Sequence, residues 1–539
     1  MAQDFVPLAE RIVDAVLESN PFLAAFAGDH RYDDRLPDWS PDGVAGDVAM
    51  LRDAANALSQ VDIDALDRQD GVDHAVLLAL VERLLFEHTE VREHEWNPLD
   101  HNPGGLLYGM LHRPYAPAEE RLTAMAGRLA AIPDALSTAR GVLTDCPRIH
   151  LETAVGQFTG AAALVRDDLS VLLAQAPALA DRVQPVRQEA VRALQEFVDW
   201  LRARLEAPAG NTREPRLGRR LWEARLWHTL DTELSAAEVL SRAEANMARA
   251  GGLLREACAE YSGGPATDAT VRAVLDRLAD DRPDDTTIVG VAKACMDEAT
   301  AFVRSHDLVS LVDDPCEILE MPEFSRGIAA AYCDAPGPLE TARMPTFFCI
   351  SPTPAGWSPE RVVSFYREYN NHMMHNLTVH EAMPGHYLQM AHSRRFHGST
   401  RARVLGFSSP FTEGWGVYAE QLMAEHGFGG LPVRIQQLKV QLRMTLNAIL
   451  DQLVHCENLD EAEAMAMMTV RAFQEEGEAA VKWRRALLTS TQLSTYFVGY
   501  TEVSAIAGSR PGGTSRREWH DAMLAHGSPA PRHVAALLG

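Results

Sequence analysis

Two histidines and a glutamate in the second half of the chain have the residue types of a hydrolytic metal site. The segment from Thr378 to His386 contains His380, Glu381 and His386, and the segment from Thr412 to Glu420 follows it after an intervening loop. Two imidazoles and one carboxylate are the ligands of many catalytic zinc sites, which keep a further position for water. We therefore predict that His380, His386 and Glu413 bind Zn²⁺, one ion per chain.

The spacing of the two histidines is unusual for a single helix. Histidines four residues apart share one helix face, whereas His380 and His386 are six apart, so that about 600° of turn leaves them roughly 120° out of line. Pro384 and Gly385 lie between them, and proline removes the hydrogen bond back to the preceding turn. We predict that the helix widens or breaks at Pro384-Gly385, which turns His386 back to face His380.

Two further glutamates complete the predicted centre. Glu381 follows His380 by about 100° of helix turn, so its carboxylate can act as the general base toward a metal-bound water without binding the metal. Glu420 lies seven residues after Glu413 on the same predicted helix face. We expect Glu420 to accept a hydrogen bond from the N–H of a ligating imidazole.

Other histidines of the chain are weaker candidates. A second His-Glu pair, His94-Glu95, is followed by Trp96, Asn97 and Pro98 instead of a Pro-Gly-His segment, so we expect a surface or packing role for it. His372 and His375 could form an i, i+3 ligand pair, but neither precedes a glutamate. We expect no metal at either place.

A polar stripe and a tyrosine could assist catalysis. Arg443, Asn447, Asp451 and His455 recur every four residues and therefore lie along one helix face. We predict that Asp451 supports the site from behind its ligands and that His455 and the phenol of Tyr496 act on the developing oxyanion. The alternatives are a solvated helix face for the stripe and a packed, satisfied hydroxyl for Tyr496.

The periodicity of apolar residues predicts a mainly α protein. Apolar residues recur at intervals of three and four from residue 4 to about 206, and again from residue 358 onward. Three short apolar segments bounded by Pro, Asp and Gly indicate strands instead, at residues 309–312, 316–322 and 346–351. We predict a large multi-helical body with a small sheet next to the active-site helix. Its parts are an N-terminal helical region (1–210) and a catalytic helical region (211–539), which holds the sheet (about 308–351) and the metal motif (380–420).

Composition narrows the classes of function. The chain of 539 residues has 50 basic and 75 acidic residues, a net charge of −25 that repels nucleic acid and anionic lipid alike. No apolar run reaches the ~20 residues that span a bilayer, and the first residues lack the pattern of a secretion signal. The seven cysteines are scattered, which is typical of a reducing compartment. We expect a cytoplasmic protein without nucleic-acid or membrane partners.

These motifs resemble a bacterial family classed as domain of unknown function 885. Its hallmarks are similar to His-Glu-x-x-Pro-Gly-His-x-x-Gln, here His380 to Gln389, and Glu-Gly-Trp-x-x-Tyr-x-Glu, here Glu413 to Glu420. The likeness extends over nearly the whole chain. It implies a relation to the gluzincin zinc metallopeptidases and a cleft like that of the large helical oligopeptidases. Asn447 departs from the arginine that the resemblance leads us to expect.

The resemblance also implies a way to bind substrate. An extended peptide could add as a strand beside residues 346–351, so we name Thr346, Phe347, Phe348 and Arg443 as substrate-binding residues. We expect a zinc-dependent metallopeptidase that hydrolyses short peptides with Glu381 as the general base. The alternatives are a non-catalytic metal- or peptide-binding protein of the same fold and a metal-dependent amidase that acts on a small non-peptide amide.

Overall fold

The computed structural model describes residues 4–207, 212–321 and 330–539, in two compact units. The first unit comprises Met1–Pro215, Pro336–Met344 and Gly398–Leu405, and the second comprises the rest of the chain. The boundary predicted at residues 210–211 lies outside the described residues. The two later segments of the first unit were not predicted, because they come from the half of the chain that carries the metal motif.

The first unit contains helices and no strand among its described residues, and it has two apolar cores. One core gathers helices near the N-terminus, and the other gathers the helices from α5 to α9. The helices of this unit are α1 (Phe5–Ser19), α2 (Pro21–Ala27), α3 (Pro41–Ser59), α4 (Arg68–Phe86), α5 (Gly104–His112), α6 (Ala118–Val142), α7 (Arg148–Ala163), α8 (Leu169–Gln175), α9 (Ala180–Glu206) and α17 (Ala402–Leu405).

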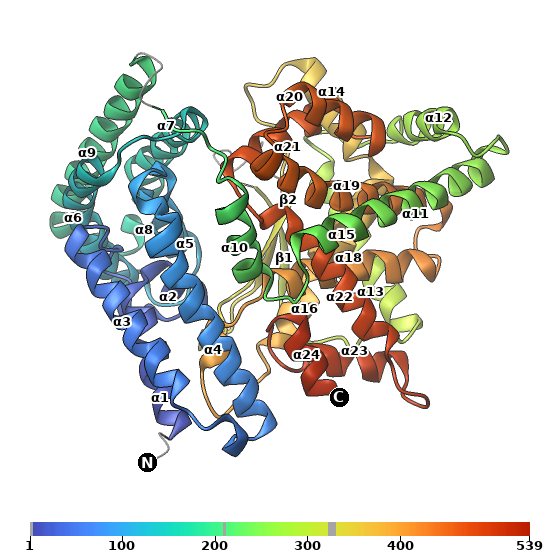
Figure 1. Ribbon diagram of the computed structural model, residues 1–539. Helices are drawn as coiled ribbons and strands as arrows, with labels where there is room; N and C mark the ends of the chain where they lie inside the picture. The colour runs from blue at the N-terminus through green and yellow to red at the C-terminus, as the bar shows by residue number, and fades with distance from the viewer. Residues whose placement is uncertain (1–3, 208–211, 322–329) are drawn as a thin grey trace. The chain divides into compact units, whose positions relative to one another are not determined.

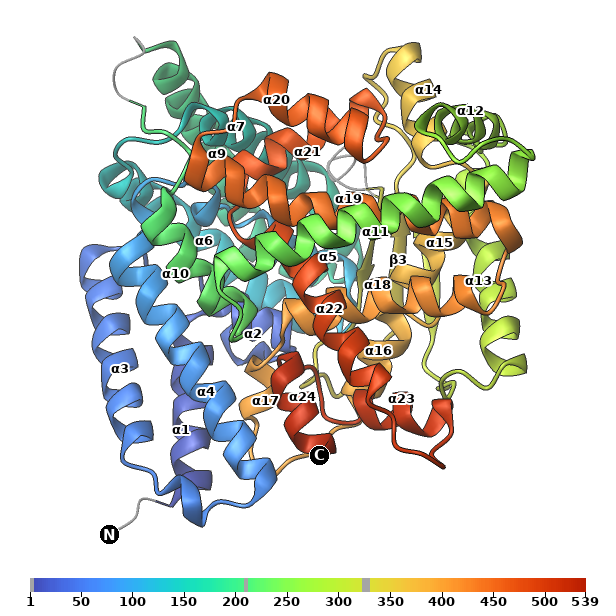
Figure 2. The same cartoon turned by 45° about the vertical axis from the view of Figure 1, so that its right-hand side comes forward.

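The second unit contains the sheet and the predicted metal motif, and it is mainly helical, as the sequence predicts (Figure 1). Helix α11 runs along α19, where Asn246 donates to Thr445 at 2.8 Å (Figure 2). The helices of the second unit are α10 (Arg219–Leu230), α11 (Ala236–Ser262), α12 (Asp268–Ala279), α13 (Ile288–Ser305), α14 (Pro359–Glu368), α15 (Asn371–Glu381), α16 (His386–Ser393), α18 (Ser409–Glu425), α19 (Gly430–Glu457), α20 (Glu461–Ala466), α21 (Glu476–Leu488), α22 (Thr495–Gly508), α23 (Arg516–Leu524) and α24 (Pro531–Leu538).

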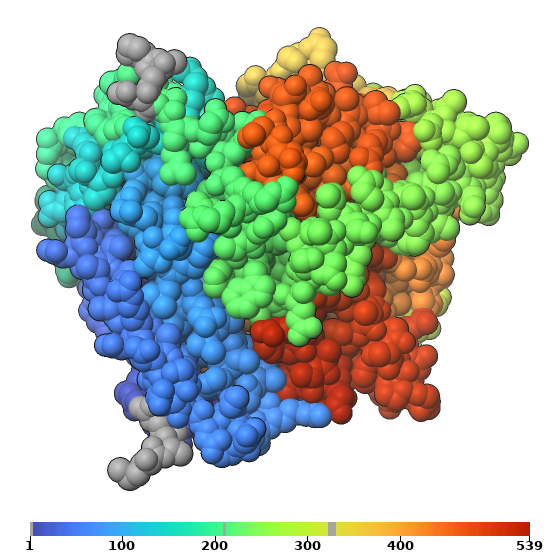
Figure 3. All heavy atoms as spheres, viewed as in Figure 1, coloured from blue at the N-terminus to red at the C-terminus, as the bar shows by residue number. Residues whose placement is uncertain are grey.

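Helix α11 also covers part of the surface of this unit. In the space-filling view the green atoms of α11 lie beside the orange atoms of residues 461–488 (Figure 3). Arg471 and Glu244 form an ion pair at 2.6 Å between these two segments. The long helix α19 is therefore packed beneath other helices, which is why most of its residues are buried.

The small sheet has three strands in the order β1-β3-β2. Strand β3 (Thr346–Ile350) pairs in parallel with β1 (Cys316–Glu320) and antiparallel with β2 (Ala331–Asp334). Strand β2 was not predicted, and the segment 309–312 forms no strand. Residues 322–329 of the predicted sheet region, which include Pro322 at the end of one predicted strand, lie outside the described residues.

The central position of β3 corrects the predicted substrate contacts. Both edges of β3 are already hydrogen-bonded, so a peptide cannot add as a strand beside it. Thr346 is 1% exposed and Phe348 is 0% exposed, and Phe348 belongs to an apolar core of this unit. Thr346 and Phe348 are therefore buried structural residues, and the half-buried Phe347 belongs to the same central strand.

Two glycines let helices α18 and α22 cross closely. A Cβ atom on Gly414 would lie 2.3 Å from the carbonyl carbon of Gly499, and one on Gly499 would lie 1.9 Å from the carbonyl oxygen of Pro410. No larger side chain fits at this crossing. The contact brings Glu413, one residue before Gly414, into the same region as Tyr496, which precedes Gly499 by one turn of α22.

A buried ion cluster ties the segment 336–344 to the start of the first unit. His30 Nδ1 lies 2.9 Å from Asp33 Oδ2, and its Nε2 lies 3.1 Å from Glu340 Oε1. The ring of Tyr115 stacks on His30 at 3.6 Å, and its hydroxyl donates to Asp33. Burial alone would lower the pKa of His30, but the two carboxylates reverse this effect and raise the pKa to about 9.

We expect Gly499→Ala to lower the free energy of unfolding by about 1–3 kcal/mol, because its methyl group overlaps the backbone of α18. Denaturant unfolding followed by circular dichroism measures the change. Gly508→Ala, on the same helix, is the matched control: a Cβ there meets no atom within 4 Å, so this variant should be as stable as the parent or slightly more stable. Equal stability of the two variants would contradict the close crossing.

We expect the stabilising effect of His30 to depend on pH. Since the pKa is about 6.5 in the unfolded chain and about 9 in the folded one, this stabilisation is fully present below pH 6.5 and is lost as pH rises through 9. Thermal unfolding of the parent and of His30→Gln, from pH 5 to pH 10, measures it. The two midpoints should differ most near pH 6 and converge above pH 9, whereas exposed His397→Gln should show no such trend.

Candidate metal centre

The helix is interrupted between the two histidines, as the sequence predicts. Helix α15 ends at Glu381 and α16 begins at His386, with a cis peptide bond between Met383 and Pro384. The N–H of Gly385 donates to the carbonyl oxygen of Val379 at 2.9 Å. A Cβ atom on Gly385 would lie 1.9 Å from the carbonyl oxygen of His380, so only glycine fits this turn.

A tryptophan from another helix holds the turn. The indole N–H of Trp415 on α18 donates to the carbonyl oxygen of Pro384 at 2.8 Å, and Trp415 is fully buried. A buried carbonyl without a partner would cost free energy, and here the indole satisfies it. The helix that carries Glu413 therefore also fixes the position of the histidine turn.

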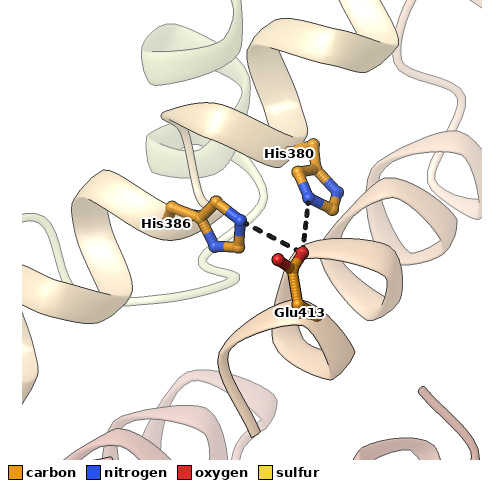
Figure 4. Close-up of side chains that lie close together, drawn as sticks. All are labelled: His380, His386 and Glu413. Carbon is orange, nitrogen blue, oxygen red and sulfur yellow. Dashed lines mark ion pairs between the residues drawn. The ribbon is translucent and has the colours of Figure 1, made fainter. Parts of the chain in front are cut away.

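The two imidazoles face each other across one carboxylate oxygen (Figure 4). The rings of His380 and His386 have centroids 4.6 Å apart and an interplanar angle of 77°. Nε2 of His380 lies 3.3 Å from Oε2 of Glu413, and Nε2 of His386 lies 3.5 Å from the same oxygen. Among the described residues, only this group of three could hold a metal ion with ligand atoms within 4.8 Å of one another.

Hydrogen bonding on the far side of His380 argues for a cation between these groups. Nδ1 of His380 lies 2.7 Å from Oε1 of Glu420, so that nitrogen carries the proton. In neutral imidazole the Nε2 lone pair then faces the Glu413 carboxylate, and two acceptors at 3.3 Å repel each other unless a proton or a metal ion lies between them. The donor set of two imidazole nitrogens and one carboxylate fits zinc.

The pKa shifts of His380 and Glu413 also indicate that the centre favours a cation. Although burial alone would lower the pKa of His380, hydrogen bonds to Glu413 and Glu420 hold it well above its usual value. Burial alone would raise the pKa of Glu413, but the two histidines hold it far below its usual range. Both directions mean that the site favours positive charge next to a carboxylate, which a divalent ion supplies.

Glu420 is fixed by an amide that the sequence did not single out. The side-chain N–H of Asn376, one turn before His380 on α15, donates to Oε2 of Glu420. The glycine at position 416 makes room for the ligand ring, because a Cβ there would lie 2.7 Å from Cε1 of His380. Asn376, Glu420 and Gly416 together set the orientation of His380.

A cavity of about 150 Å³ lies beside the centre, within the second unit. Its walls come from α15, α18, α19, α21 and α22 and from the start of β2. They include His380, Glu381, Glu420, Arg443, Asn447, Lys482, Arg485 and Tyr496. A concave site with several convergent polar groups is the usual setting for a bound ligand.

Glu381, the predicted general base, lines this cavity. It is 8% exposed, lines the cavity next to His380, and receives no hydrogen bond from any described residue. Burial raises the pKa of Glu381, and the neighbouring His386 and His380 oppose that rise. A carboxylate with raised pKa and no fixed partner can accept a proton from a reacting water.

Tyr496 lines the same cavity, and its phenolic hydrogen is available to donate a hydrogen bond. Nη2 of Arg485 donates to the hydroxyl oxygen of Tyr496 at 3.1 Å. Since the oxygen accepts this bond, the phenolic hydrogen can donate to a group in the cavity. Arg443, the predicted substrate-binding arginine, also lines the cavity wall, as does Asn447.

His455 and Asp451 have structural roles instead of the predicted ones. Nε2 of His455 lies 3.0 Å from the carbonyl oxygens of Ala486 and Thr489, and its Nδ1 accepts from the N–H of Leu217 at 3.3 Å. With both nitrogens engaged, and without a place in the cavity wall, His455 cannot serve as the oxyanion donor. Burial lowers its pKa, which keeps the ring neutral.

Asp451 contacts no metal ligand. It accepts hydrogen bonds from the indole of Trp222, the N–H of Thr491 and the hydroxyl of Ser494, at 3.1, 3.0 and 2.9 Å. Ser494 immediately precedes α22, so Asp451 fixes the start of the helix that carries Tyr496. The four-residue spacing correctly predicted that Asp451 and His455 share a helix face, but it did not predict which groups that face contacts.

The weaker histidine candidates pack against other groups. His94 stacks on Trp39 at 5.8 Å, and Glu95 pairs with Arg92. Nε2 of His375 lies 3.0 Å from Glu298, and Nε2 of His372 lies 3.5 Å from Asp281.

The sequence assigned no task to two residues in or near the motifs, because only the fold shows their partners. Trp415 belongs to the motif Glu413 to Glu420, and Asn376 lies four residues before His380. Lys482 gave one clue: the chain has three lysines among 50 basic residues, and two of them, Lys439 and Lys482, are buried in this unit. A rare residue type in a buried position points to a specific contact.

The fold and the site define a class: a mainly helical protein with a small sheet and a His-His-Glu centre that opens on a cavity. The family model described as "Bacterial protein of unknown function (DUF885)" matches residues 21–538, and the chain belongs to this family. The resemblance of the two motifs is thereby confirmed at the level of the family.

Solved structures share the fold over their whole length. A protein described as a "putative lipoprotein of unknown function" from Shewanella oneidensis is 26% identical, with a TM-score of 0.82 and 100% of each chain covered. A protein described as a "putative lipoprotein" from Colwellia psychrerythraea is 16% identical, with a TM-score of 0.78 over 99% of this chain and 98% of its own, and shows the fold alone. No curated protein matches significantly. In the described part of this chain, no helix combines the length and apolarity needed to cross a bilayer.

We expect Glu420→Gln to lower zinc affinity about 10- to 100-fold, because the amide cannot supply the charge that orients His380. Elemental analysis and competition with a chelator measure the stoichiometry, expected at one zinc per chain, and the affinity. Glu425→Gln changes an exposed glutamate of the same helix and should leave zinc affinity unchanged. Equal affinities in the two variants would contradict the assigned role of Glu420.

Proposed function

We propose that the protein is a zinc-dependent metallopeptidase that hydrolyses short peptides. The observation that carries the proposal is the convergence of His380, His386 and Glu413 next to Glu381, whose carboxylate faces a cavity without a hydrogen-bond partner among the described residues. Three ligands with an adjacent free carboxylate are the parts of a metal-assisted hydrolysis.

Each side chain has a task in this proposal. Zinc held by the three ligands would supply a Lewis acid that lowers the pKa of water and polarises a carbonyl. Glu381 accepts the proton of the attacking water and passes it to the leaving amine. Tyr496 donates its phenolic hydrogen to the oxyanion, while Arg485 holds the phenol oxygen at 3.1 Å and favours negative charge nearby.

The cavity wall, in place of the buried strand β3, supplies the proposed contacts to the peptide. Ala331 at the start of β2 lines the cavity, as do His380 and Arg443. A peptide bound in this cavity would contact these residues, and the guanidinium of Arg443 would bind a polar group of the peptide.

A relation to the gluzincin peptidases, with a cleft like theirs, is part of this proposal. It is supported by His380 and His386 on consecutive helices and by Glu413 on a third helix, α18. A second glutamate of α18, Glu420, orients His380. We also propose that the protein works in the cytoplasm, on the ground that all seven cysteines are free thiols.

We expect Glu381→Gln to keep its zinc and to lose about 10²- to 10⁴-fold in peptide hydrolysis, because the amide cannot accept the proton. Mass spectrometry of peptide mixtures detects new termini, and elemental analysis gives the metal content. Glu95→Gln, in the other His-Glu pair of the chain, is the matched control and should retain full activity.

Two outcomes would favour the other candidate functions. Zinc-loaded parent protein that binds peptides without producing new termini would indicate a non-catalytic binding protein. Hydrolysis of small amides without cleavage of any peptide would indicate an amidase. Full peptide hydrolysis by Glu381→Gln would contradict the proposed base.

A further inference from the structure

One part of the cavity wall has more positive charge than its carboxylates can balance. Among the described residues that line the cavity from α19 and α21, three are cations, Arg443, Lys482 and Arg485, and one is a carboxylate, Glu478. Glu368 is already engaged by Lys439, whose Nζ lies 2.8 Å from Oε2. Nη1 of Arg443 is 3.6 Å from Glu368 and 3.9 Å from Glu478, which are ion-pair distances without a hydrogen bond.

Lys482 is buried in the wall and forms no hydrogen bond with any described residue. Its side chain is 9% exposed, and the nearest carboxylate oxygen, Oε1 of Glu478, lies 3.9 Å from Nζ. Burial and the cations of Arg485 and Arg443, opposed by Glu478, lower the pKa of Lys482 to about 7. A buried ammonium that its surroundings do not fully compensate favours an anionic ligand beside it.

Arg485 connects these cations to the predicted oxyanion donor. Its Nη2 donates to Gln492 at 2.7 Å and to Tyr496 at 3.1 Å, both neutral groups, and it pairs with no carboxylate of the described residues. Lys482 and Arg485 are three residues apart on α21, so they share one face at a separation of about 4.5 Å along the axis. One extended peptide residue spans a similar length, about 3.5 Å.

We propose that Arg443, Lys482 and Arg485 bind the free C-terminal carboxylate of a short peptide, so that the enzyme removes one or two residues from the carboxyl end. This inference rests on the proposed peptidase function, because it places the scissile bond near Tyr496. The cations stand on α19 and α21, whereas the metal ligands stand on α15, α16 and α18. A peptide terminus would therefore be held from a different wall than the scissile carbonyl.

The test compares matched peptides on the zinc-loaded protein. Each sequence is synthesised as a free acid, as a C-terminal amide, and as an amide with an internal glutamate. We expect free acids to be cleaved one or two residues from the end, with kcat/KM at least about tenfold above that of the amides. Lys482→Met should raise KM for the free acids about tenfold and thereby reduce the preference for free acids over amides. Lys293→Met, at an exposed position, should alter neither.

Three results would overturn the inference. The first is equally fast cleavage of free acids and plain amides. The second is an unchanged preference for free acids in Lys482→Met. The third is cleavage of amides with an internal glutamate as fast as that of free acids, which would indicate that the cations bind acidic side chains. Calorimetry with Glu381→Gln measures the affinities for acid and amide without turnover. A protein that prefers free acids in binding but hydrolyses no peptide would contradict the proposed function alone.

Discussion

The rest of the site depends on the break in the chain between His380 and His386. A continuous helix would send the two rings to different sides, and the turn at Pro384-Gly385 brings their centroids to 4.6 Å. The break is possible because Gly385 has no side chain and because Trp415 satisfies the carbonyl of Pro384. One helix, α18, thus supplies the carboxylate of Glu413, the support for His380 and the bond that holds the turn.

The positions of the ligands are set by close packing as much as by hydrogen bonds. Gly416 gives the ring of His380 its space, and Gly414 and Gly499 let α18 and α22 approach with their backbones in contact. Side chains at these glycines would move Glu413 and Tyr496 relative to each other. Preorganisation of a polar site therefore depends here on residues with no functional group at all.

Charge is divided between the walls of the cavity. Glu381 and Glu420 stand near the two histidines, where a divalent cation would neutralise the carboxylates, whereas Arg443, Lys482 and Arg485 stand on other helices. A substrate that presents a carbonyl to the first group and an anion to the second would be oriented by both. The net charge of −25 is a property of the whole chain and does not describe this cavity.

Local features of the sequence determined much of this protein. Apolar periodicity predicted the helices, and the fixed ring of Pro384 with Gly385 predicted where α15 ends, because both effects act within a few residues. Tertiary structure alone decided that β3 is the central strand, that His455 and Asp451 hold backbone and hydroxyl groups, and that Lys482 faces the cavity. Each of these depends on contacts between segments that are distant in the chain, such as the contact between Asp451 and Trp222. The local sequence of a helix face does not identify the segment that packs against it.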